Sequence, residues 1–165
     1  MSSRARIACF HGGGSTAAIF EFQCETLQKT LSDVFEFVFF DAPFESGAGP
    51  GILPTFSDEK YGPYRTWFSK DSEGVLRRDG RGDNERGEGG IERVVRLIEE
   101  EGEGGEWVGC MGFSQGTRVV GGLLLEQMRL REMGVPGFAD GEIQFKFGVL
   151  CNGGAEPMLA ELSYR

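Results

Sequence analysis

Four short apolar runs, each followed by a turn that contains glycine or proline, constrain the fold of this chain more than any other feature. They cover residues 6–10, 35–40, 107–113 and 145–151. Short continuous apolar runs bounded by such turns are typical of buried β-strands. Parallel strands need a long crossover, usually a helix, between them. The pattern therefore predicts an α/β fold with a parallel sheet of about four strands.

Helical spacing between the runs supports this prediction. Apolar residues recur every three or four positions in three segments: Phe20, Cys24, Leu27 and Leu31; Ile91, Val94, Val95 and Ile98; and Val119, Val120, Leu123 and Leu124. Each set marks one face of an amphipathic helix. Ser15 or Thr16 can cap the first of these helices, and the last is expected to end near Met133.

Length and composition limit the classes of function that this chain can have. The 165 residues suit a single domain, 1–165, and 39% hydrophobic residues are enough for a core. The net charge of −9 argues against a nucleic-acid surface. An apolar run of ~18 residues, which a membrane span needs, does not occur, and a secretory signal is not visible. We therefore expect a cytoplasmic protein without nucleic-acid or membrane partners.

The cysteines give no sign of a disulfide or zinc framework. The four, Cys9, Cys24, Cys110 and Cys151, form no CxxC pair, and the chain has one histidine. They are interpreted as small hydrophobic residues in a reducing compartment. We expect neither a metal nor an organic cofactor.

Two segments lack the periodic spacing of apolar residues that marks a helix or a strand. Residues 42–75 carry glycines, prolines and several aromatic side chains, and a long loop of this kind is predicted to cover a site. Tyr61, Tyr64 and Trp67 are its candidate substrate-binding residues, with packing onto the core as the alternative. Residues 77–90 are charged, rich in glycine and almost free of apolar residues, which predicts a mobile surface loop.

A catalytic motif lies between the third apolar run and the helix after it. Gly112-Phe113-Ser114-Gln115-Gly116 fits G-x-S-x-G, the pattern of a nucleophile elbow. The tight turn holds the Ser114 hydroxyl away from the sheet, and glycines at both ends let strand and helix approach. The backbone N–H of Gln115, at the helix N-terminus, is then aimed at a developing oxyanion. The alternative is a tight turn that serves packing alone.

A second glycine turn follows the first run. In His11-Gly12-Gly13-Gly14, a hydrolase would use the N–H of Gly13 or Gly14 as its other oxyanion donor. The same residues permit a rival interpretation. Gly12-x-Gly14-x-x-Ala17, with Asp41 ending the next run, has the spacing of a dinucleotide-binding fingerprint and would indicate a reductase.

Beyond the motifs, the chain as a whole resembles a known family. The order HGGG, FVFFDAP, GAGPGI, YRTWF and GEWVGCMGFSQGTRVVGGLL is similar to the fungal serine-hydrolase family of the α/β-hydrolase superfamily, from about Arg6 to Gly154. That family includes thiohydrolases that release polyketide chains from their synthases. The resemblance implies the sheet order 35–40, 6–10, 107–113, 145–151. It also implies Ser114 as nucleophile, with Gln115 and Gly13 as oxyanion donors.

The chain departs from this family after the fourth run. The family's acid and histidine base follow that strand, whereas here fourteen residues remain and the single histidine is His11. Three explanations stay open: a truncated sequence with an incomplete sheet, an inactive copy, or His11 as base with Glu156 as acid. The first predicts an unpaired apolar edge at residues 145–151, and hence poor solubility or an edge-strand homodimer.

These observations predict a serine hydrolase that cleaves an ester or thioester, with a polyketide-type acyl thioester as the implied substrate. Its partner would be a small or carrier-bound acyl substrate, and by resemblance a polyketide synthase. The alternatives are an impaired remnant that binds acyl groups or a partner, and the dinucleotide-dependent reductase.

Overall fold

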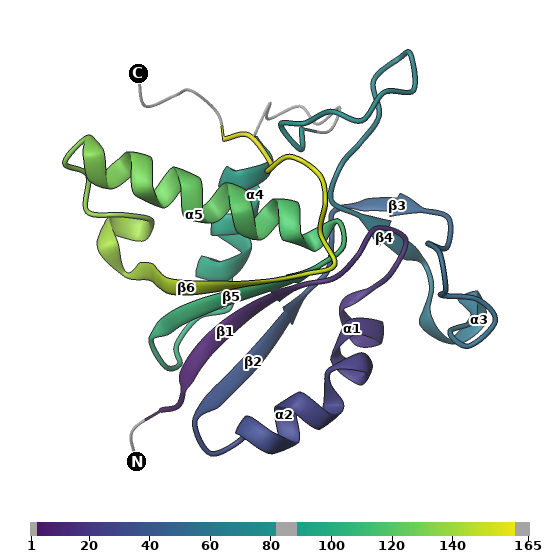
Figure 1. Cartoon of the computed structure of the whole chain (residues 1–165), viewed down its shortest axis with the longest axis horizontal. Coiled ribbons are helices and arrows are strands. Elements are labelled where there is room, and N and C mark those ends of the chain that lie inside the picture. Colours follow the sequence, from purple (N-terminus) through teal and green to yellow (C-terminus); the bar gives the residue numbers. More distant parts are fainter. Residues whose placement is uncertain (1–2, 82–88, 161–165) are drawn as a thin grey trace.

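A computed structural model describes residues 3–81 and 89–160 of the chain. Its centre is a four-stranded sheet in which every pairing is parallel (Figure 1). The strands are β1 (Ala5–Phe10), β2 (Phe35–Phe40), β5 (Trp107–Phe113) and β6 (Ile143–Cys151). Their order is β2-β1-β5-β6, which confirms the predicted fold class and sheet order. The fourth strand begins two residues earlier than expected.

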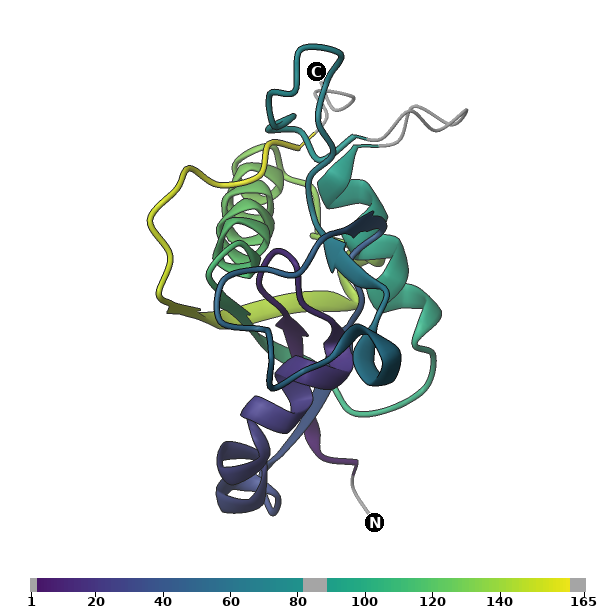
Figure 2. The ribbon, with the colours of Figure 1, turned by 90° about the vertical axis from the view of Figure 1, so that its right-hand side faces the viewer.

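Helices cover both faces of this sheet. Figure 2 shows α4 (Gly90–Glu100) and α5 (Gly116–Glu132) above the strands, with α1 (Ala17–Gln23) and α2 (Glu25–Leu31) below. A short 3-10 helix, Ala139–Gly141, precedes β6.

The first predicted helix is divided in two. Thr16 caps α1 as expected, because its hydroxyl accepts the Ile19 N–H at 3.2 Å. The helix stops at Cys24, whose ψ of 6° departs from helical geometry, and α2 starts at the next residue. Neither glycine nor proline marks this break, so the apolar spacing alone predicted one continuous helix.

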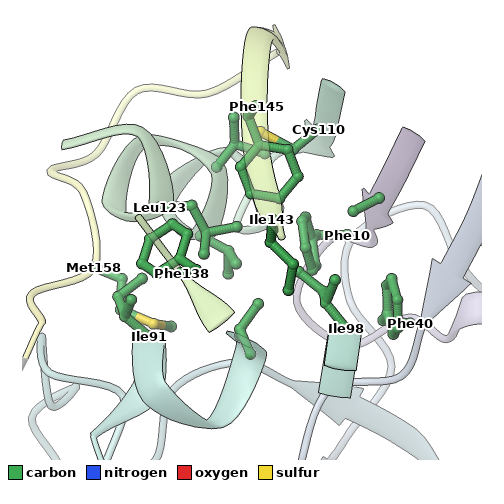
Figure 3. Packing of buried hydrophobic residues seen from close by; sticks show 14 of the residues in the cluster. Phe10, Phe40, Ile91, Ile98, Cys110, Leu123, Phe138, Ile143, Phe145 and Met158 are labelled. Carbon is green, nitrogen blue, oxygen red and sulfur yellow. The ribbon is translucent and has the colours of Figure 1, made fainter. Parts of the chain in front are cut away.

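The core fixes the two central strands. On the α4 and α5 face, buried residues including Phe10, Ile98, Leu123 and Phe145 form one cluster (Figure 3). On the other face a smaller cluster joins β1 and β5 to α1 through Cys9, Met111 and Phe20. Because β1 and β5 are adjacent and buried, the turns that follow them are held side by side.

The segment 42–75 differs from the unstructured loop that was predicted. It contains β3 (Phe44–Ser46), α3 (Asp58–Tyr61) and β4 (Tyr64–Thr66), and β3 pairs with β4 in antiparallel register. Strands of three residues are too short to show a period of two, which explains why the sequence pattern missed them. Figure 1 places this small sheet next to the ends of β1 and β2.

Part of the predicted mobile loop at 77–90 lies outside the described residues, which exclude 82–88. At its beginning, the Arg77 N–H donates to the Ser69 carbonyl at 2.9 Å. Residues 152–160, which follow β6, form neither helix nor strand. Within this segment, the side chain of Met158 is buried among α4 and α5. Among the described residues, no helix is long and apolar enough to span a membrane.

Candidate active site

The backbone bends sharply at Ser114, between β5 and α5. Ser114 has a φ of +49°, in the left-handed region that residues other than glycine rarely adopt. Its N–H donates to the Cys151 carbonyl at 2.9 Å, and its carbonyl accepts the Thr117 N–H at 3.0 Å. Strain held in this way by surrounding hydrogen bonds is typical of functional sites. The serine is half-buried, and its hydroxyl makes no hydrogen bond within the described residues.

Two glycines make this bend possible. A methyl group on Gly112 would collide with the backbone of Gly116, and one on Gly116 would collide with the Phe10 carbonyl. Strand β5 therefore meets α5, and α5 meets β1, at distances that only glycine allows. The sequence motif predicted glycine at both positions for this reason, because glycine lets the strand and the helix approach each other.

The first glycine turn lies against the second. A Cβ on Gly12 would be 3.5 Å from the Ser114 Cβ and 3.4 Å from the Phe113 ring, which is ordinary contact. A Cβ on Gly13 would be 3.0 Å from the side-chain amide of Gln115. The structure thus brings Ser114, Gln115 and Gly13 together at one end of the sheet.

Hydrogen bonding separates the two candidate donors of the first turn. The Gly14 N–H donates to the Arg65 carbonyl at 2.8 Å and is therefore occupied. Within the described part of the chain, the N–H groups of Gly13 and Gln115 make no hydrogen bond. They are consequently backbone donors near Ser114 that have no protein acceptor, with Gln115 at the positive end of the 17-residue helix α5.

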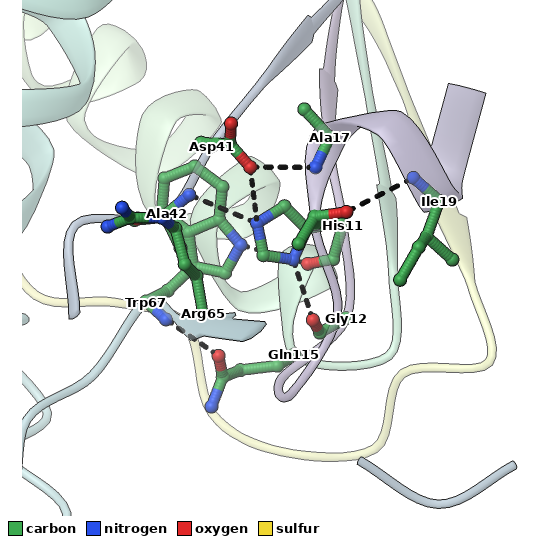
Figure 4. A network of polar contacts seen from close by, with 10 residues as sticks. His11, Gly12, Ala17, Ile19, Asp41, Ala42, Arg65, Trp67 and Gln115 are labelled. Carbon is green, nitrogen blue, oxygen red and sulfur yellow. Dashed lines mark hydrogen bonds and ion pairs between the residues drawn. The ribbon is translucent and has the colours of Figure 1, made fainter. Parts of the chain in front are cut away.

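His11 braces its own turn. Its ring is fully buried and lies on Trp67, with ring centroids 5.3 Å apart. Nε2 accepts the Ala42 N–H at 3.0 Å, so the proton is assigned to Nδ1, which donates to the Gly12 carbonyl at 2.7 Å (Figure 4). Burial lowers the pKa of His11, outweighing the Gly12 carbonyl and the Asp41 carboxylate, which favour the charged form.

These contacts contradict the hypothesis of His11 as base with Glu156 as acid. Both ring nitrogens of His11 are bound to backbone groups, so neither can accept the Ser114 proton in this arrangement. Glu156 instead forms an ion pair with Arg78 at 2.8 Å on the surface. Bracing by hydrogen bonds, the simpler interpretation of His11, is what the structure shows.

The dinucleotide hypothesis also fails on geometry. The carboxylate of Asp41 accepts the Ala17 N–H at 2.8 Å and so caps α1, where a ribose-binding acid would need to be free. The Gly49 backbone packs directly on Gly14, and its N–H donates to the Gly14 carbonyl at 2.9 Å. The space that a pyrophosphate would need is therefore filled by the chain itself.

Sequence reasoning missed the role of β4. The Oε1 atom of Gln115 accepts from the Thr66 hydroxyl at 2.9 Å and from the Trp67 N–H at 2.8 Å. The Trp67 indole N–H donates to the His11 carbonyl at 2.9 Å. Strand β4 and the residue that follows it thus hold both glycine turns. The partners are 48 to 56 residues apart in sequence, and no local pattern signals such contacts.

A pocket of about 640 Å³ opens beside these turns. Its lining includes Gly13 and Gln115 together with apolar side chains of Phe44, Phe68 and Leu76. Small-molecule sites commonly have this size and this mixture of apolar walls with a few polar groups.

The three aromatic residues that the sequence singled out lie elsewhere. Tyr64 is buried against Ile19 and Phe56, and its hydroxyl donates to the Phe56 carbonyl at 2.6 Å. Trp67 is buried in the main core, and Tyr61 packs on Phe56. None of the three lines the 640 Å³ pocket, so packing is the role that their contacts show.

Buried thiols are unsuited to replace Ser114 as nucleophile. Burial raises the pKa of Cys110 to about 12 and raises that of Cys9 as well. Both are therefore protonated at neutral pH, and only a thiolate is strongly nucleophilic.

Known proteins resemble this chain over most of its length. A family model described as "Serine hydrolase (FSH1)" matches residues 1–162. Esterase GME11355 of Pestalotiopsis microspora is 34% identical over 98% of this chain and 59% of the relative. Esterase citA of Monascus ruber is 39% identical over 91% of this chain and 56% of the relative. The chain therefore spans a little over half the length of these curated relatives.

A solved structure is also similar. The crystal structure of Arabidopsis thaliana SOBER1 matches with a TM-score of 0.45 at 14% identity, covering 93% of this chain and 91% of that one. The family match covers nearly the whole sequence, including both glycine turns and Ser114. This chain belongs to the FSH1 serine hydrolase family.

Proposed function

We propose that this chain is a serine esterase or thioesterase with Ser114 as its nucleophile. The observation that supports the proposal is the position of Ser114: its backbone is held at a φ of +49° beside a glycine turn. Two N–H groups there, those of Gly13 and Gln115, have no partner within the described residues. A serine on a strained turn beside backbone donors is the part of an acyl-transfer site that holds the nucleophile and stabilises the oxyanion.

In the proposed reaction, Ser114 Oγ attacks the carbonyl carbon of the substrate, and the hydroxyl proton leaves. The two N–H groups stabilise the negative charge on the carbonyl oxygen. The intermediate then collapses, the alcohol or thiol departs with a proton, and an acyl-enzyme remains. Water adds to the acyl carbon, and release of the acid restores the serine.

The fate of the first proton limits the rate. His11 is the only histidine of the chain, and its ring nitrogens are occupied. We propose that water takes the proton in this 165-residue chain. Sites without a working triad retain about 10³–10⁴-fold acceleration over water from oxyanion stabilisation and binding. Turnover should therefore be confined to esters and thioesters with good leaving groups.

We further propose a polyketide-type acyl thioester as the natural substrate class, delivered by a carrier or synthase. Support comes from the family membership and from the pocket beside Gly13, whose lining includes the apolar side chains of Phe44, Phe68 and Leu76. The diketide acetoacetyl-N-acetylcysteamine is a small probe of this class.

Hydrolysis of p-nitrophenyl butyrate and of this thioester by wild type and by Ser114→Ala tests the proposal. Ser72→Ala, which changes an exposed serine, is the matched control. Wild type and the control should release product at equal rates, and Ser114→Ala should fall to the rate of buffer. Equal rates in wild type and Ser114→Ala would refute the proposal.

One observation favours a second candidate, acyl binding without turnover: no imidazole is free to activate Ser114 or water. The same assay separates the two. A burst of one p-nitrophenolate per chain, with no steady state above buffer, would indicate that the acyl-enzyme forms and persists.

A further inference from the structure

The side chain of Gln115 is bound at one end and open at the other. Its bonded atom accepts from the Trp67 N–H at 2.8 Å and from the Thr66 hydroxyl at 2.9 Å. A backbone N–H can only donate, so this atom is the carbonyl oxygen, and the position of the amide nitrogen is fixed. Within the described residues, Nε2 makes no hydrogen bond and keeps both of its protons available (Figure 4).

This amide lies beside the candidate oxyanion donors. A Cβ on Gly13 would be 3.0 Å from Nε2, and both residues line the 640 Å³ pocket. Ser114 itself does not line the pocket, so in the proposed reaction the acyl chain would run from Ser114 past Gly13 and this nitrogen to reach it. The lining also includes apolar side chains (Phe44, Phe68 and Leu76) and polar ones (Glu45, Ser46, Thr66, Ser69 and Lys70).

We infer that the Gln115 amide selects acyl groups that carry an acceptor oxygen close to the scissile carbonyl. Keto, hydroxyl and ether oxygens on the first few chain atoms belong to this class. The inference rests on the proposed function, because it assigns the acyl group of that reaction to this pocket. A purely aliphatic chain would cover the Nε2 donor and leave it unpaired, which costs binding energy.

Other donors at the pocket are less suited to this selection. Lys70 lines the pocket but is exposed, so a hydrogen bond to its ammonium group competes with water. The Thr66 hydroxyl already donates to Gln115. The Ser46 and Ser69 hydroxyls donate to the Gly47 and Arg81 carbonyls. Among the side chains that line the pocket in the described residues, Gln115 is therefore the one whose donor is held in place and has no acceptor.

A pair of isosteric esters measures the selection. p-Nitrophenyl 3-methoxypropanoate and p-nitrophenyl pentanoate have the same leaving group and chain length, and differ by one ether oxygen in place of a methylene. Wild type should prefer the ether ester about fivefold in kcat/KM, the usual effect of one hydrogen bond. The ratio of the two rates cancels any general loss of activity.

Two variants separate the Nε2 donor from the hydrogen bonds that hold Oε1 of Gln115 in place. Gln115→Glu keeps an oxygen for Thr66 and Trp67 but replaces the NH₂ group with a second acceptor, so the preference should vanish or invert. Thr66→Val removes one of the two hydrogen bonds to Oε1 but keeps Nε2, so the ratio of kcat/KM for the two esters should remain within about twofold of wild type. An unchanged ratio in Gln115→Glu would overturn the inference.

Nuclear magnetic resonance provides a readout that needs no catalysis. In Ser114→Ala, the side-chain NH₂ signal of Gln115 should shift on titration with N-ethyl-3-methoxypropanamide and remain in place with N-ethylpentanamide. Its absence from spectra of the Gln115→Glu variant assigns the signal. A shift without Ser114-dependent hydrolysis would uphold the donor role and reject the proposed function. Hydrolysis that depends on Ser114, with neither an ether preference nor an ether-dependent shift, would uphold the proposed function and reject the donor role.

Discussion

At the scale of single residues, the site depends on glycine where strand, helix and turn touch. Gly116 shows this most clearly, because a methyl group there would meet the Phe10 and His11 carbonyls. Both are backbone atoms, one at the end of β1 and one in the turn that follows it, and they cannot move aside as a flexible side chain would. The elbow is thus an outcome of close backbone packing as well as of the serine's own conformation.

Gly116→Ala should lower the free energy of unfolding by about 1–3 kcal/mol or more, because overpacking forces the backbone to shift. Gly154→Ala, with no atom near the added methyl group, is the control and should be close to neutral. Urea titration followed by tryptophan fluorescence measures both. If the two variants unfolded at the same urea concentration, the close contact at Gly116 would be wrong.

His11 predicts a specific dependence of stability on pH. Burial lowers its pKa in the folded state, whereas in the unfolded chain it titrates near its ordinary value of about 6.5. Below that pH the unfolded state therefore binds more protons, and the free energy of unfolding falls as pH falls. Above it, His11 is neutral in both states and contributes no slope.

Urea titrations of wild type and His11→Asn between pH 5 and 8 test this account. Wild type should lose more stability than the variant between pH 6.5 and 5. Carboxylates that titrate in the same range are common to both proteins, so the difference isolates His11. Parallel curves for the two proteins would show that the ring is not held neutral.

At the scale of elements, β4 connects parts of the site that belong to different segments. It bonds to the first glycine turn through the Arg65 carbonyl and to the elbow through Thr66, and Trp67, the next residue, adds a second bond to the elbow. The two glycine turns were predictable from sequence because each motif is local and each follows an apolar run. Strand β4 was not, because it has three residues and its partners are distant in the chain.

The contacts explain the other differences from the sequence predictions in the same way. Tyr64 and Trp67 were candidates for the site because aromatic residues on a loop often line pockets, yet both are buried. Gly12-x-Gly14-x-x-Ala17 fits a dinucleotide fingerprint by spacing, but spacing carries no information on what packs above the turn. Here the Gly49 backbone occupies that place. Local patterns predicted the four strands of the central sheet and the helical segments between them but missed the short elements of 42–75, and tertiary contacts were needed to assign the partners of the two turns.

Residues 152–160 are held to the helices mainly by Met158. Its side chain is 2% exposed, and methyl groups on Gly90 or Gly122 would collide with this residue. Its N–H donates to the Arg118 carbonyl at 2.8 Å. A glycine-lined recess on α4 and α5 therefore receives this side chain.

Met158→Ala should lower the free energy of unfolding by about 2–5 kcal/mol, the usual loss for a buried methionine. The neighbouring Leu159 is 49% exposed, and Leu159→Ala should change stability by less than about 0.5 kcal/mol. Calorimetry of the two variants gives the comparison. Equal melting temperatures would mean that the segment is not anchored in the recess.

At the scale of the whole molecule, β6 leaves one side of the sheet open. Among the described residues its one neighbouring strand is β5, apart from an isolated bridge between Ile143 and Phe138, and it exposes Phe147, Val149 and Leu150 at 39%, 40% and 55%. An apolar strand with unpaired backbone groups is a template for pairing with another chain. We propose that two copies of this chain associate through β6.

Light scattering coupled to size-exclusion chromatography should give the mass of a dimer for wild type. Leu150→Lys places a charge on the edge and should give a monomer. Leu159→Lys, also exposed but outside the sheet, should stay dimeric. A monomeric wild type at the same concentrations would contradict the predicted edge pairing.

Intact-mass spectrometry after treatment with a fluorophosphonate tests the account most directly. Wild type should gain the mass of one adduct, located on the peptide that contains Ser114, and Ser114→Ala should gain none. In the proposed site, the N–H groups of Gly13 and Gln115 would bind the phosphonyl oxygen of the adduct. An unmodified wild type, or an equal adduct in Ser114→Ala, would show that Ser114 is not an active nucleophile.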